Sequence, residues 1–382
     1  MKIVLVTRGY PSKKHPQIGN FEATQAHALA KLGYEVIIIG LNCYSIKNYD
    51  IIGYHERVEG NIPIYEDYHL AVPTHNLMPI GIMSKILTKS LLRIFKKVIS
   101  VHGMPDIIHS HYMLMTSAAV SLRQIYGVPL VCTEHWSKIN SPVISKSIIN
   151  LGKSTYQYVD KIIAVSHQTS KSIKDKFGFS ADVIYNMVED SMFDKCENII
   201  SNPSTTFISI GEMSDNRKGF DILIKAFSKY LKEGHEGKLI LRGHGRLKGE
   251  YRNLAKIEGV EQQVEFVGEI TLPELRTLVA SSDVVVMSSR IETFGVVLIE
   301  GMAQGKPVIA TRCGGPEEFI TPDLGILVDV ENVDQLCNAM INVKKNYSKY
   351  NRDHIITSCK ENYSQSRIAN KLTDIYSALV IK

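Results

Sequence analysis

Short runs of β-type residues alternate with helical segments along most of this 382-residue chain. In the first half, KIVLVT, EVIIIG, DIIHSH, PLVCTEH and KIIAVS have the pattern of strands, with helical stretches such as NFEATQAHALAKLG and SKSIKDKFG between them. Strands that are separated by helices predict a parallel sheet with helices on its faces. The expected fold class is therefore α/β.

The alternation stops once and then starts again. In the polar stretch EDSMFDKCENIISNPST, residues 189–205, apolar residues follow neither the spacing of a helix nor that of a strand. After it, FISIG, KLILRG, VEFVG, DVVVMSS and PVIAT again alternate with helices. A chain of this length can bury two separate cores. We therefore predict two Rossmann-like, doubly wound domains, at residues 1–200 and 201–360, and a final helix at residues 361–382. Two such domains that face a central cleft would bind ligands with the loops that follow their strands.

Composition and charge exclude several classes of protein. The chain has 44 Lys and Arg residues and 39 Asp and Glu residues, which gives a net charge of +5. This charge is too small to indicate a nucleic acid partner. The chain has no apolar run of about 18 residues, and its start MKIVLVTRGY lacks the features of a signal peptide. We expect a cytoplasmic protein without a membrane span. The six cysteines are scattered singly, without the spacing of zinc ligands, which is typical of reduced core residues.

A basic amphipathic helix is predicted within residues 77–103. Apolar residues follow a helical spacing there, and cations fall largely on the opposite side. The apolar set is Met83, Leu87, Leu91, Ile94, Phe95 and Val98, and the basic set is Lys85, Lys89, Arg93, Lys96 and Lys97. One interpretation is a surface helix whose apolar side covers the domain core. The other is peripheral contact of residues 83–98 with an anionic membrane surface, such as the inner face of the cell membrane.

The densest cluster of chemically informative residues runs from Ser288 to Glu300, where a strand leads into a helix. A helix that starts near Phe294 would direct free backbone N–H groups and its positive dipole end at the preceding loop, and Gly295 would permit the close approach of a diphosphate. Glu292 and Glu300 would lie roughly 10 Å apart along such a helix, so that one could hold a sugar and the other a ribose. The alternative is local capping by Glu300 and an ordinary turn at Gly295.

The Glu-x7-Glu pattern of Glu292 and Glu300 lies inside a longer sequence that resembles glycosyltransferase family 4, the bacterial polysaccharide-type group 1, over nearly the whole chain. The resemblance implies a GT-B fold, in which an N-terminal acceptor-binding domain and a C-terminal donor-nucleotide-binding domain face a central cleft. It also implies that the last helix packs back on the N-terminal domain. Retention of the anomeric configuration of the transferred sugar follows from the same resemblance.

In the N-terminal half, the resemblance assigns two positions. Gly19, in the Gly-Asn-Phe segment before AHALAKLGYEV, corresponds to the family's glycine that faces the donor phosphates. The stretch TEH corresponds to the family's T-x-H at a strand end, which places His135 near the transferred sugar. The alternative is that His135 supports a loop through a hydrogen bond. His109 and His111 lie on one face of a strand and are left out of catalysis, because such histidines are more often hydrogen-bonded structural residues.

In the C-terminal half, Gly211 and the later Arg217-Lys218-Gly219 resemble the family's Gly-Arg…Lys-Gly segment. Two adjacent cations in this loop would stabilise charge on the leaving diphosphate. Glu212 stands where the first Arg of the family pattern is usual, which leaves open which cation contacts which phosphate.

The resemblance assigns further loops to the nucleotide. The Gly-x-Gly turn of LRGHG would lie beside the nucleotide, and the strand end FVGEI would meet the base with its backbone. Gly314-Gly315 would turn backbone N–H groups toward the sugar or phosphate. For all three, a plain structural turn is the alternative. The predicted catalytic residues are His135, Arg217, Lys218 and Glu292, and the predicted donor-binding residues are Gly19, Gly211, Gly243, Gly245, Val267, Ile270, Phe294, Gly295, Val296, Val297 and Glu300.

The expected protein is thus a hexosyltransferase that moves sugar from a nucleotide-sugar donor, a UDP-sugar rather than GDP-mannose, to a glycan or lipid-linked acceptor in surface polysaccharide or glycolipid biosynthesis. No Asp-x-Asp pair is present to hold a divalent metal, so neither a metal nor another cofactor is expected. The alternatives are a nucleotide-sugar epimerase of the same fold and a non-catalytic sugar-nucleotide-binding partner subunit. A Rossmann oxidoreductase is disfavoured because the segment after the first strand lacks G-x-G-x-x-G.

Overall fold

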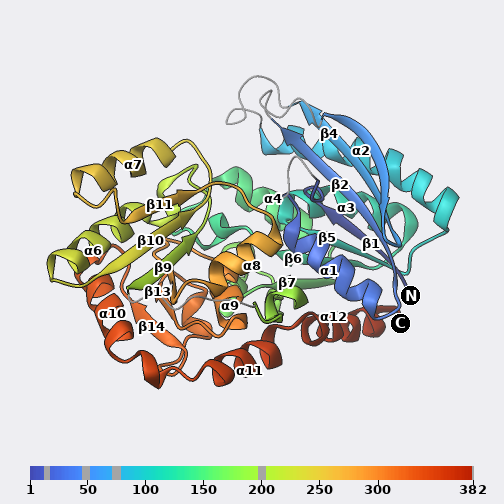
Figure 1. Ribbon diagram of the computed structural model, residues 1–382. Helices are drawn as coiled ribbons and strands as arrows, with labels where there is room; N and C mark the ends of the chain where they lie inside the picture. Colours follow the sequence, from blue (N-terminus) through green and yellow to red (C-terminus); the bar gives the residue numbers. More distant parts are fainter. Residues whose placement is uncertain (13–17, 45–51, 71–78, 197–203, 381–382) are drawn as a thin grey trace. The chain divides into compact units, whose positions relative to one another are not determined.

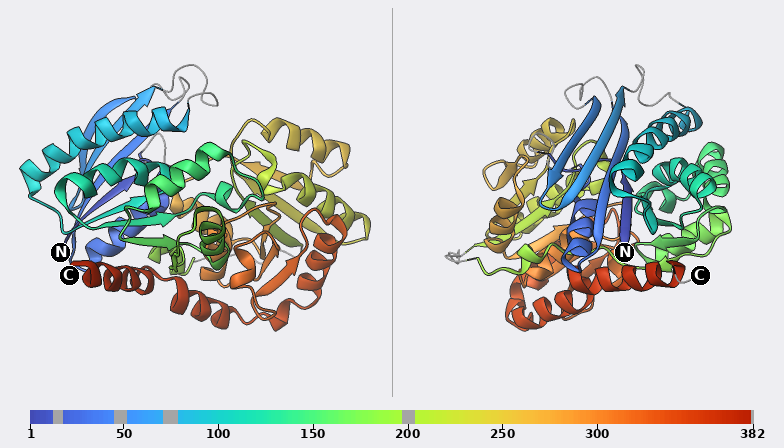
Figure 2. Two further views of the ribbon diagram at one scale, coloured as in Figure 1. Left: turned by 180° about the vertical axis from the view of Figure 1, so that it is seen from behind. Right: turned by 90° about the vertical axis from the view of Figure 1, so that its right-hand side faces the viewer.

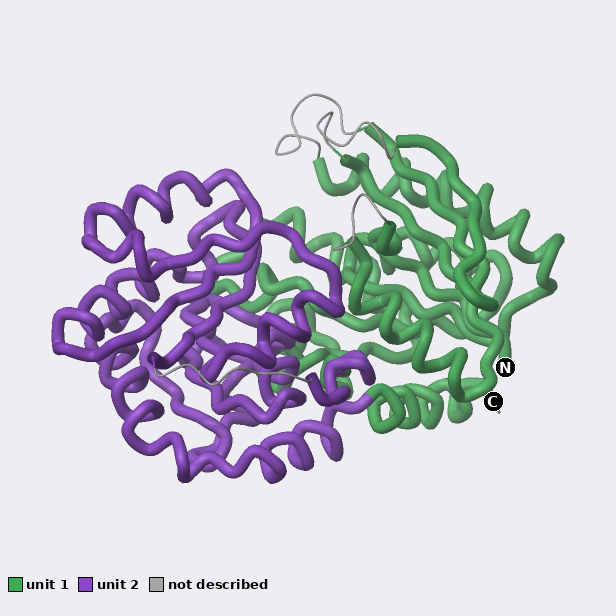
Figure 3. The backbone as a smooth tube through the Cα atoms, in the orientation of Figure 1, with its two compact units in different colours: residues 1–187, 365–382 green, residues 188–364 purple. Residues whose placement is uncertain are grey.

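The computed structural model of the chain describes residues 1–12, 18–44, 52–70, 79–196 and 204–380. The chain divides into two compact units (Figure 3). Unit 1 consists of Met1–Met187 and Gln365–Lys382, and unit 2 consists of Val188–Ser364. Each unit is built on its own largely parallel sheet with helices around it (Figure 1). The predicted class, two α/β domains with parallel sheets, is confirmed.

Unit 1 contains a sheet in the strand order β3-β4-β2-β1-β5-β6-β7-β8. Only the pair of β3 and β4 is antiparallel among its described pairings. The order reverses beside β1, because the chain leaves β1 toward β2 and later returns to its other side as β5. The strands are β1 Lys2–Thr7, β2 Glu35–Tyr44, β3 Gly53–Glu59, β4 Ile62–Leu70, β5 Ile107–His111, β6 Leu130–Glu134, β7 Lys161–Ala164 and β8 Asp182–Val183.

Helices cover both faces of the sheet of unit 1 (Figure 2). In β1, Val4 packs in a core with residues of α2 and α3, whereas Leu5 packs in a core with residues of α1 and α12. Because both faces are buried, the strand is a continuous apolar run rather than an alternating one. The helices of this unit are α1 Asn20–Lys31, α2 Ile80–His102, α3 Met113–Tyr126, α4 Lys146–Tyr156, α5 His167–Phe177 and α12 Gln365–Val380.

Unit 2 contains a parallel sheet in the order β11-β10-β9-β12-β13-β14. The order reverses beside β9, which pairs with β10 on one side and with β12 on the other. The strands are β9 Thr205–Ile210, β10 Gly237–Arg242, β11 Val264–Val267, β12 Val284–Met287, β13 Val308–Thr311 and β14 Gly325–Val328. The helices are α6 Phe220–Lys232, α7 Lys248–Ile257, α8 Leu272–Ala280, α9 Val296–Ala303, α10 Val333–Lys345 and α11 Arg352–Tyr363.

The structure divides the chain earlier than the predicted boundary between residues 200 and 201. The segment that starts at Val188 belongs to unit 2. The backbone N–H of Val188 donates to the carbonyl of Tyr363 at 2.8 Å, and Asp194 of the same segment forms an ion pair with Arg276 at 2.8 Å. The predicted final helix is also interrupted. Helix α11 ends at Tyr363 in unit 2, and α12 begins at Gln365 in unit 1.

Helix α2 is the basic amphipathic helix expected from the sequence. Its apolar residues, Leu87, Leu91, Ile94, Phe95 and Val98, are at most 1% exposed and belong to a core of unit 1. On its basic side, Arg93 pairs with Asp67 and Lys97 with Glu56. The apolar stripe is therefore used within the protein. Within the described residues, no helix is long and apolar enough to cross a membrane.

Replacement of Phe95 tests the structural role of this stripe. We expect Phe95→Ala to lower the free energy of unfolding by about 3–5 kcal/mol, because it removes a fully buried ring. The matched control is Val101→Ala on the same helix, where the side chain is 60% exposed and the change should stay within about 0.5 kcal/mol. Both values come from denaturant unfolding followed by far-ultraviolet circular dichroism. Equal losses in the two variants would contradict the packing described.

Candidate functional site

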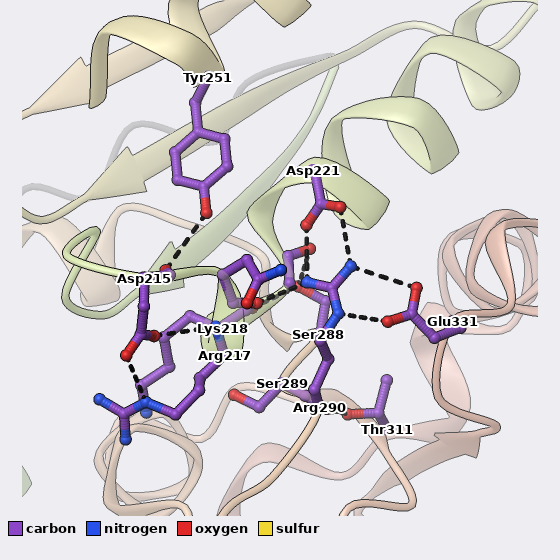
Figure 4. A network of polar contacts seen from close by, with 12 residues as sticks. Asp215, Arg217, Lys218, Asp221, Tyr251, Ser288, Ser289, Arg290, Thr311 and Glu331 are labelled. Carbon is purple, nitrogen blue, oxygen red and sulfur yellow. Dashed lines mark hydrogen bonds and ion pairs between the residues drawn. The ribbon is translucent and has the colours of Figure 1, made fainter. Parts of the chain in front are cut away.

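Two loops at the carboxyl ends of β9 and β12 touch each other in unit 2 (Figure 4). The first contains a short 3-10 helix, Asn216–Lys218, and ends at Gly219, whose φ of 63° is left-handed. A Cβ atom on Gly219 would lie 1.9 Å from the carbonyl oxygen of Ser288. The Ser288 hydroxyl donates hydrogen bonds to the carbonyls of Lys218 and Gly219 at 3.0 and 2.9 Å. The first loop is thus fixed on the second.

The contact between these loops brings two predicted catalytic residues together. Nζ of Lys218 lies 2.5 Å from a carboxylate oxygen of Glu292, and these side chains are only 23% and 14% exposed. Burial alone would raise the pKa of Glu292, but the Lys218 charge and the N–H of Thr293 outweigh it and lower the pKa. Glu292 is therefore a carboxylate at neutral pH. A cation and an anion in one half-buried site can meet both a phosphate and sugar hydroxyls.

Arg217 has a more exposed position. Its Nε lies 2.7 Å from the Asp215 carboxylate, and the two side chains are 45% and 41% exposed. Such surface pairs contribute little to stability, so the guanidinium can exchange partners easily. Glu212, at the position where the family pattern has Arg, accepts a hydrogen bond from the Ser214 hydroxyl at 2.5 Å. Of the two predicted cations, Lys218 is the one already in contact with Glu292.

Arg290 joins the two loops, and the sequence did not indicate it. Its guanidinium forms two hydrogen bonds with Asp221, at 2.9 and 2.8 Å, and further bonds with Glu331 and with the carbonyl of Asn216 (Figure 4). Its backbone N–H donates to the carbonyl of Arg217 at 2.7 Å. These partners come from two separate parts of the sequence, both distant from Arg290, so no local motif could reveal them. We refer to this set as the Arg290 clamp.

Helix α9 begins as predicted, immediately after Gly295, which has a φ of 102°. No side chain caps this end and its first turn holds no acidic residue, so the N–H groups of Val296 and Val297 have the orientation that suits an anion. The Phe294 ring is completely buried and packs on Phe319 at 5.1 Å between ring centroids. Only the backbone of Phe294 can therefore contact a ligand.

Glu300 lies further along α9 and is electrostatically linked to Arg242. Burial raises the pKa of Glu300 to about 7, although the Arg242 charge acts to lower it. Arg242 is 6% exposed and donates to the carbonyl of Ile270 at 3.4 Å, while its Nε has no hydrogen-bond partner within the described residues. Arg242 is thus a second residue that the sequence did not indicate. It lies between the predicted ribose carboxylate and the predicted base-binding backbone.

The predicted glycine turns meet at the ends of β9, β10 and β11. The Gly211 N–H donates to the carbonyl of Arg242, and the Gly243 N–H donates to the carbonyl of Val267, both at 3.0 Å. A Cβ atom on Gly245 would lie 2.2 Å from the backbone of Met213. The backbone N–H of Gly314 was expected to face a sugar or phosphate, but it donates to the carboxylate of Glu317.

The remaining predicted residues, Gly19 and His135, belong to unit 1. Gly19 precedes α1 with a φ of 71°, and a Cβ atom there would lie 2.1 Å from the carbonyl oxygen of Gly9. His135 follows β6, stacks on Phe21 at 6.2 Å and shares a hydrogen bond with His111 at 3.1 Å. Burial lowers the pKa of His135 well below its ordinary value, so the ring is neutral.

Across the parts of the chain that the structure describes, no three His, Cys, Asp or Glu side chains gather in a way that could hold a metal ion. Two predicted catalytic residues, Lys218 and Glu292, are in contact, and Arg217 is next to Lys218 in the chain. In the same unit, Arg242 contacts Gly211 and Ile270 through hydrogen bonds and pairs with Val267 in the sheet.

Each half of the chain matches the model of a known protein family. The model of the family described as Glycosyltransferase Family 4 matches residues 21–191, and the model described as Glycosyl transferases group 1 matches residues 193–357. An uncharacterized glycosyltransferase of Methanocaldococcus jannaschii, MJ1607, is 29% identical over 98% of both chains. A second one from that organism, MJ1178, is 30% identical over 66% of this chain and 69% of its own. The putative teichuronic acid biosynthesis glycosyltransferase TuaC of Bacillus subtilis is 23% identical over 89% of this chain and 88% of its own.

Solved structures show the same fold. Sucrose-phosphate synthase of Thermosynechococcus elongatus superposes with a TM-score of 0.81 at 20% identity, covering 100% of this chain and 99% of that chain. HepE of Anabaena, solved in complex with UDP and glucose, superposes with a TM-score of 0.76 at 18% identity, covering 99% of this chain and 100% of that chain.

Loss of the Arg290 clamp should destabilise unit 2. We expect Arg290→Gln to lower the free energy of unfolding by about 1–3 kcal/mol, because it leaves the partly buried Asp221 without its cation. Burial acts to raise the pKa of Asp221, but Arg290 holds it below its ordinary 3.8, so this stability is present above that pH and disappears as the pH falls below it.

Denaturant unfolding at neutral pH and at about pH 3 measures both effects. The control is Arg217→Gln, whose exposed pair with Asp215 should contribute less than about 1 kcal/mol. If the two variants were equally stable at neutral pH, the clamp would have no structural role.

Proposed function

Because the chain belongs to glycosyltransferase family 4, the group 1 glycosyltransferases, we propose that it transfers a hexosyl unit from a UDP-sugar to an acceptor hydroxyl, with retention of configuration and without a metal ion. The observation that carries this proposal is the contact of Lys218 with Glu292, in the same unit as the uncapped start of α9 and Glu300. Lys218 and the start of α9 suit a diphosphate, and the carboxylates of Glu292 and Glu300 suit the hydroxyls of a sugar and a ribose.

The donor diphosphate carries the charge that this site can neutralise. We propose that Lys218 and the N–H groups of Val296 and Val297 bind the phosphates, and that Arg217 moves from Asp215 to join them. These cations and dipoles act most strongly when the bond to the diphosphate breaks, because negative charge then builds up on it. The N–H groups at the start of α9 are held in place before the donor arrives, whereas Lys218 and Arg217 exchange their carboxylate partners for phosphate.

The transferred sugar would replace Lys218 as the partner of Glu292. When a phosphate engages Lys218, the Glu292 carboxylate becomes free to accept hydrogen bonds from sugar hydroxyls. In the proposed step, the bond between the anomeric carbon and the diphosphate breaks, and a bond to the acceptor oxygen forms on the same face. The acceptor proton passes to an oxygen of the leaving phosphate. His135, in unit 1, is proposed to orient a sugar oxygen.

The choice of UDP and the biological setting have separate support. HepE, which has the same fold, was solved with UDP and glucose, and this favours a uridine nucleotide. TuaC is described as a teichuronic acid biosynthesis enzyme, which favours a role in polysaccharide synthesis. We propose a glycan or lipid-linked acceptor on this basis.

Nucleotide binding without metal is the first test. We expect the protein in the presence of EDTA to bind UDP more tightly than GDP, ADP or NAD in isothermal titration calorimetry. Glu300→Ala should weaken UDP binding, because the ribose hydroxyls lose their acceptor, whereas Glu292→Ala should mainly lower kcat. Preferential binding of NAD, or a need for Mg²⁺, would overturn the proposal. Release of epimerised sugar without acceptor would indicate an epimerase.

The same experiment has a pH dependence. A Glu300 pKa of about 7 means that the carboxylate form becomes more abundant as the pH rises from 6 to 8. If only that form binds the ribose, UDP affinity should increase by up to about tenfold over this range. Glu300→Gln serves as the control, because any pH dependence that remains belongs to the nucleotide itself.

Membrane contact of residues 83–98 is proposed as a purely electrostatic interaction, since the apolar stripe of α2 is buried. Within the described residues, Lys85, Lys89 and Lys96 are exposed and form no ion pair. Replacing all three with Gln should weaken binding to vesicles that contain anionic lipid, by about 1 kcal/mol per lysine. Replacing Lys153, Lys171 and Lys174, exposed lysines elsewhere in unit 1, is the matched control. Equal vesicle affinity of the two variants in a flotation assay would exclude this contact.

A further inference from the structure

Arg8 lies at the point in the sheet of unit 1 where open α/β sheets bind their ligands. It directly follows the last residue of β1, and β1 lies between β2 and β5, where the strand order reverses. The carboxyl ends of the strands at such a reversal form a crevice that usually holds a ligand. Arg8 is exposed there, and the function proposed above does not use it.

The guanidinium group of Arg8 is held by Tyr112, which follows the neighbouring strand β5. Its central carbon lies 3.6 Å from the centre of the Tyr112 ring, and its Nη2 donates to the Tyr112 hydroxyl at 2.7 Å. The backbone of Arg8 is fixed as well, because its carbonyl accepts from the Asn42 amide at 3.3 Å and from the Tyr44 hydroxyl at 3.1 Å. The cation therefore has a defined orientation without a ligand.

Tyr112 has a strained backbone that its neighbours keep in place. Its φ of 66° is positive, which is rare for a residue with a side chain and costs about 1–3 kcal/mol. The Tyr112 N–H donates to the carbonyl of Thr133 at 3.0 Å, and its carbonyl accepts from the N–H and the hydroxyl of Thr116 at 3.0 and 2.9 Å. These bonds fix the ring on which Arg8 is stacked.

Arg8 forms no ion pair with any residue that the structure describes. Three other arginines of unit 1 differ in this respect, since Arg57, Arg93 and Arg123 pair with carboxylates at 3.1, 2.6 and 2.7 Å. The flat face of the Arg8 guanidinium covers Tyr112, and its Nε and Nη1 have no hydrogen-bond partner within the described residues. These N–H groups on the edge of the guanidinium are therefore available to a ligand.

The charges of two buried carboxyl groups, Glu22 and Glu134, act on Arg8, but neither pairs with it within the described part of the chain. Glu134 is used by other donors, because it accepts from the N–H groups of Met113 and Trp136 at 2.9 and 2.8 Å. Burial raises the pKa of Glu22, although the Arg8 charge acts to lower it, and this favours the neutral acid. The positive charge of Arg8 is thus left for a ligand.

We propose that Arg8 binds an oxyanion of the acceptor, so that the glycan or lipid-linked acceptor carries a phosphate or carboxylate group. An arginine that is stacked on an aromatic ring presents its edge N–H groups to two oxygens of such a group at once. The assignment to the acceptor rests on the proposed function. The groups proposed for the donor diphosphate, Lys218, Arg217 and the start of α9, all belong to unit 2, whereas Arg8 belongs to unit 1, where the acceptor is expected.

Anion titration of the full chain, followed by NMR, tests the site directly. In protein labelled with 15N-arginine, each Nε–H group gives one signal, and Arg8→Gln identifies the Arg8 signal by its loss. We expect inorganic phosphate or acetate to shift this signal to saturation, whereas sodium chloride at the same ionic strength should not. Saturation by phosphate alone would assign a phosphate group to the acceptor, and saturation by acetate alone would assign a carboxylate.

The matched control is Arg367 on α12 of the same unit, which is also exposed and forms no ion pair with a described residue. Its signal, identified by Arg367→Gln, should not saturate with either anion, because no aromatic ring within the described residues orients its guanidinium. Equal responses of Arg8 and Arg367 to phosphate and to acetate would overturn the proposal.

Calorimetry with UDP distinguishes the acceptor from the donor. Arg8→Gln should leave the Kd for UDP unchanged, and an increase of about tenfold or more, the loss expected for a charge-assisted hydrogen bond, would place Arg8 at the donor and overturn the proposal. If the wild type did not bind UDP, the proposed function would fail, while the anion titration would still decide whether Arg8 binds an oxyanion. If Arg8→Gln does not fold, Arg8→Lys identifies the same signal and replaces it in the calorimetry.

Discussion

At Gly219, the backbone of one loop lies so close to the carbonyl oxygen of Ser288 that no side chain larger than hydrogen fits between them. This approach allows the Ser288 hydroxyl to bond with two carbonyls of the first loop, and it brings Lys218 within reach of Glu292. The two residues are far apart in sequence, and this contact helps to hold their loops together. The proposed donor chemistry therefore depends on a glycine that touches no ligand.

Each cation near this contact has a carboxylate partner, and the partners differ in burial. Glu292, the partner of Lys218, is 14% exposed, and Asp221, one partner of Arg290, is 28% exposed, whereas Arg217 and Asp215 are 45% and 41% exposed. Screening by water makes the exposed pair the easiest to separate. The same loop thus contains a rigid part, held by the Arg290 clamp, and a cation that can move. A diphosphate needs both, because it must be bound firmly and then released.

The sequence could predict the features that have a local signal. Alternating strands and helices indicated two parallel sheets, and the stretch from Ser288 to Glu300 indicated a strand that leads into a helix near Gly295. Arg242 and Arg290 could not be found in this way, because their partners lie in distant segments and a single arginine after a strand has no distinctive pattern. The boundary at Val188 was missed for the same reason: a few long-range bonds attach a polar segment to unit 2.

The chain passes from unit 1 to unit 2 after Met187 and returns at Gln365, so unit 2 is an uninterrupted segment inserted into unit 1. Ile368, Leu372 and Tyr376 of α12 belong to the core that also contains Leu5 of the first strand. During synthesis, α1 covers only part of this face of the N-terminal sheet until the last helix has been made, whereas unit 2 already has all of its residues. The order of completion is therefore the reverse of the order in sequence, and the unit that begins first is the last to be able to close its core.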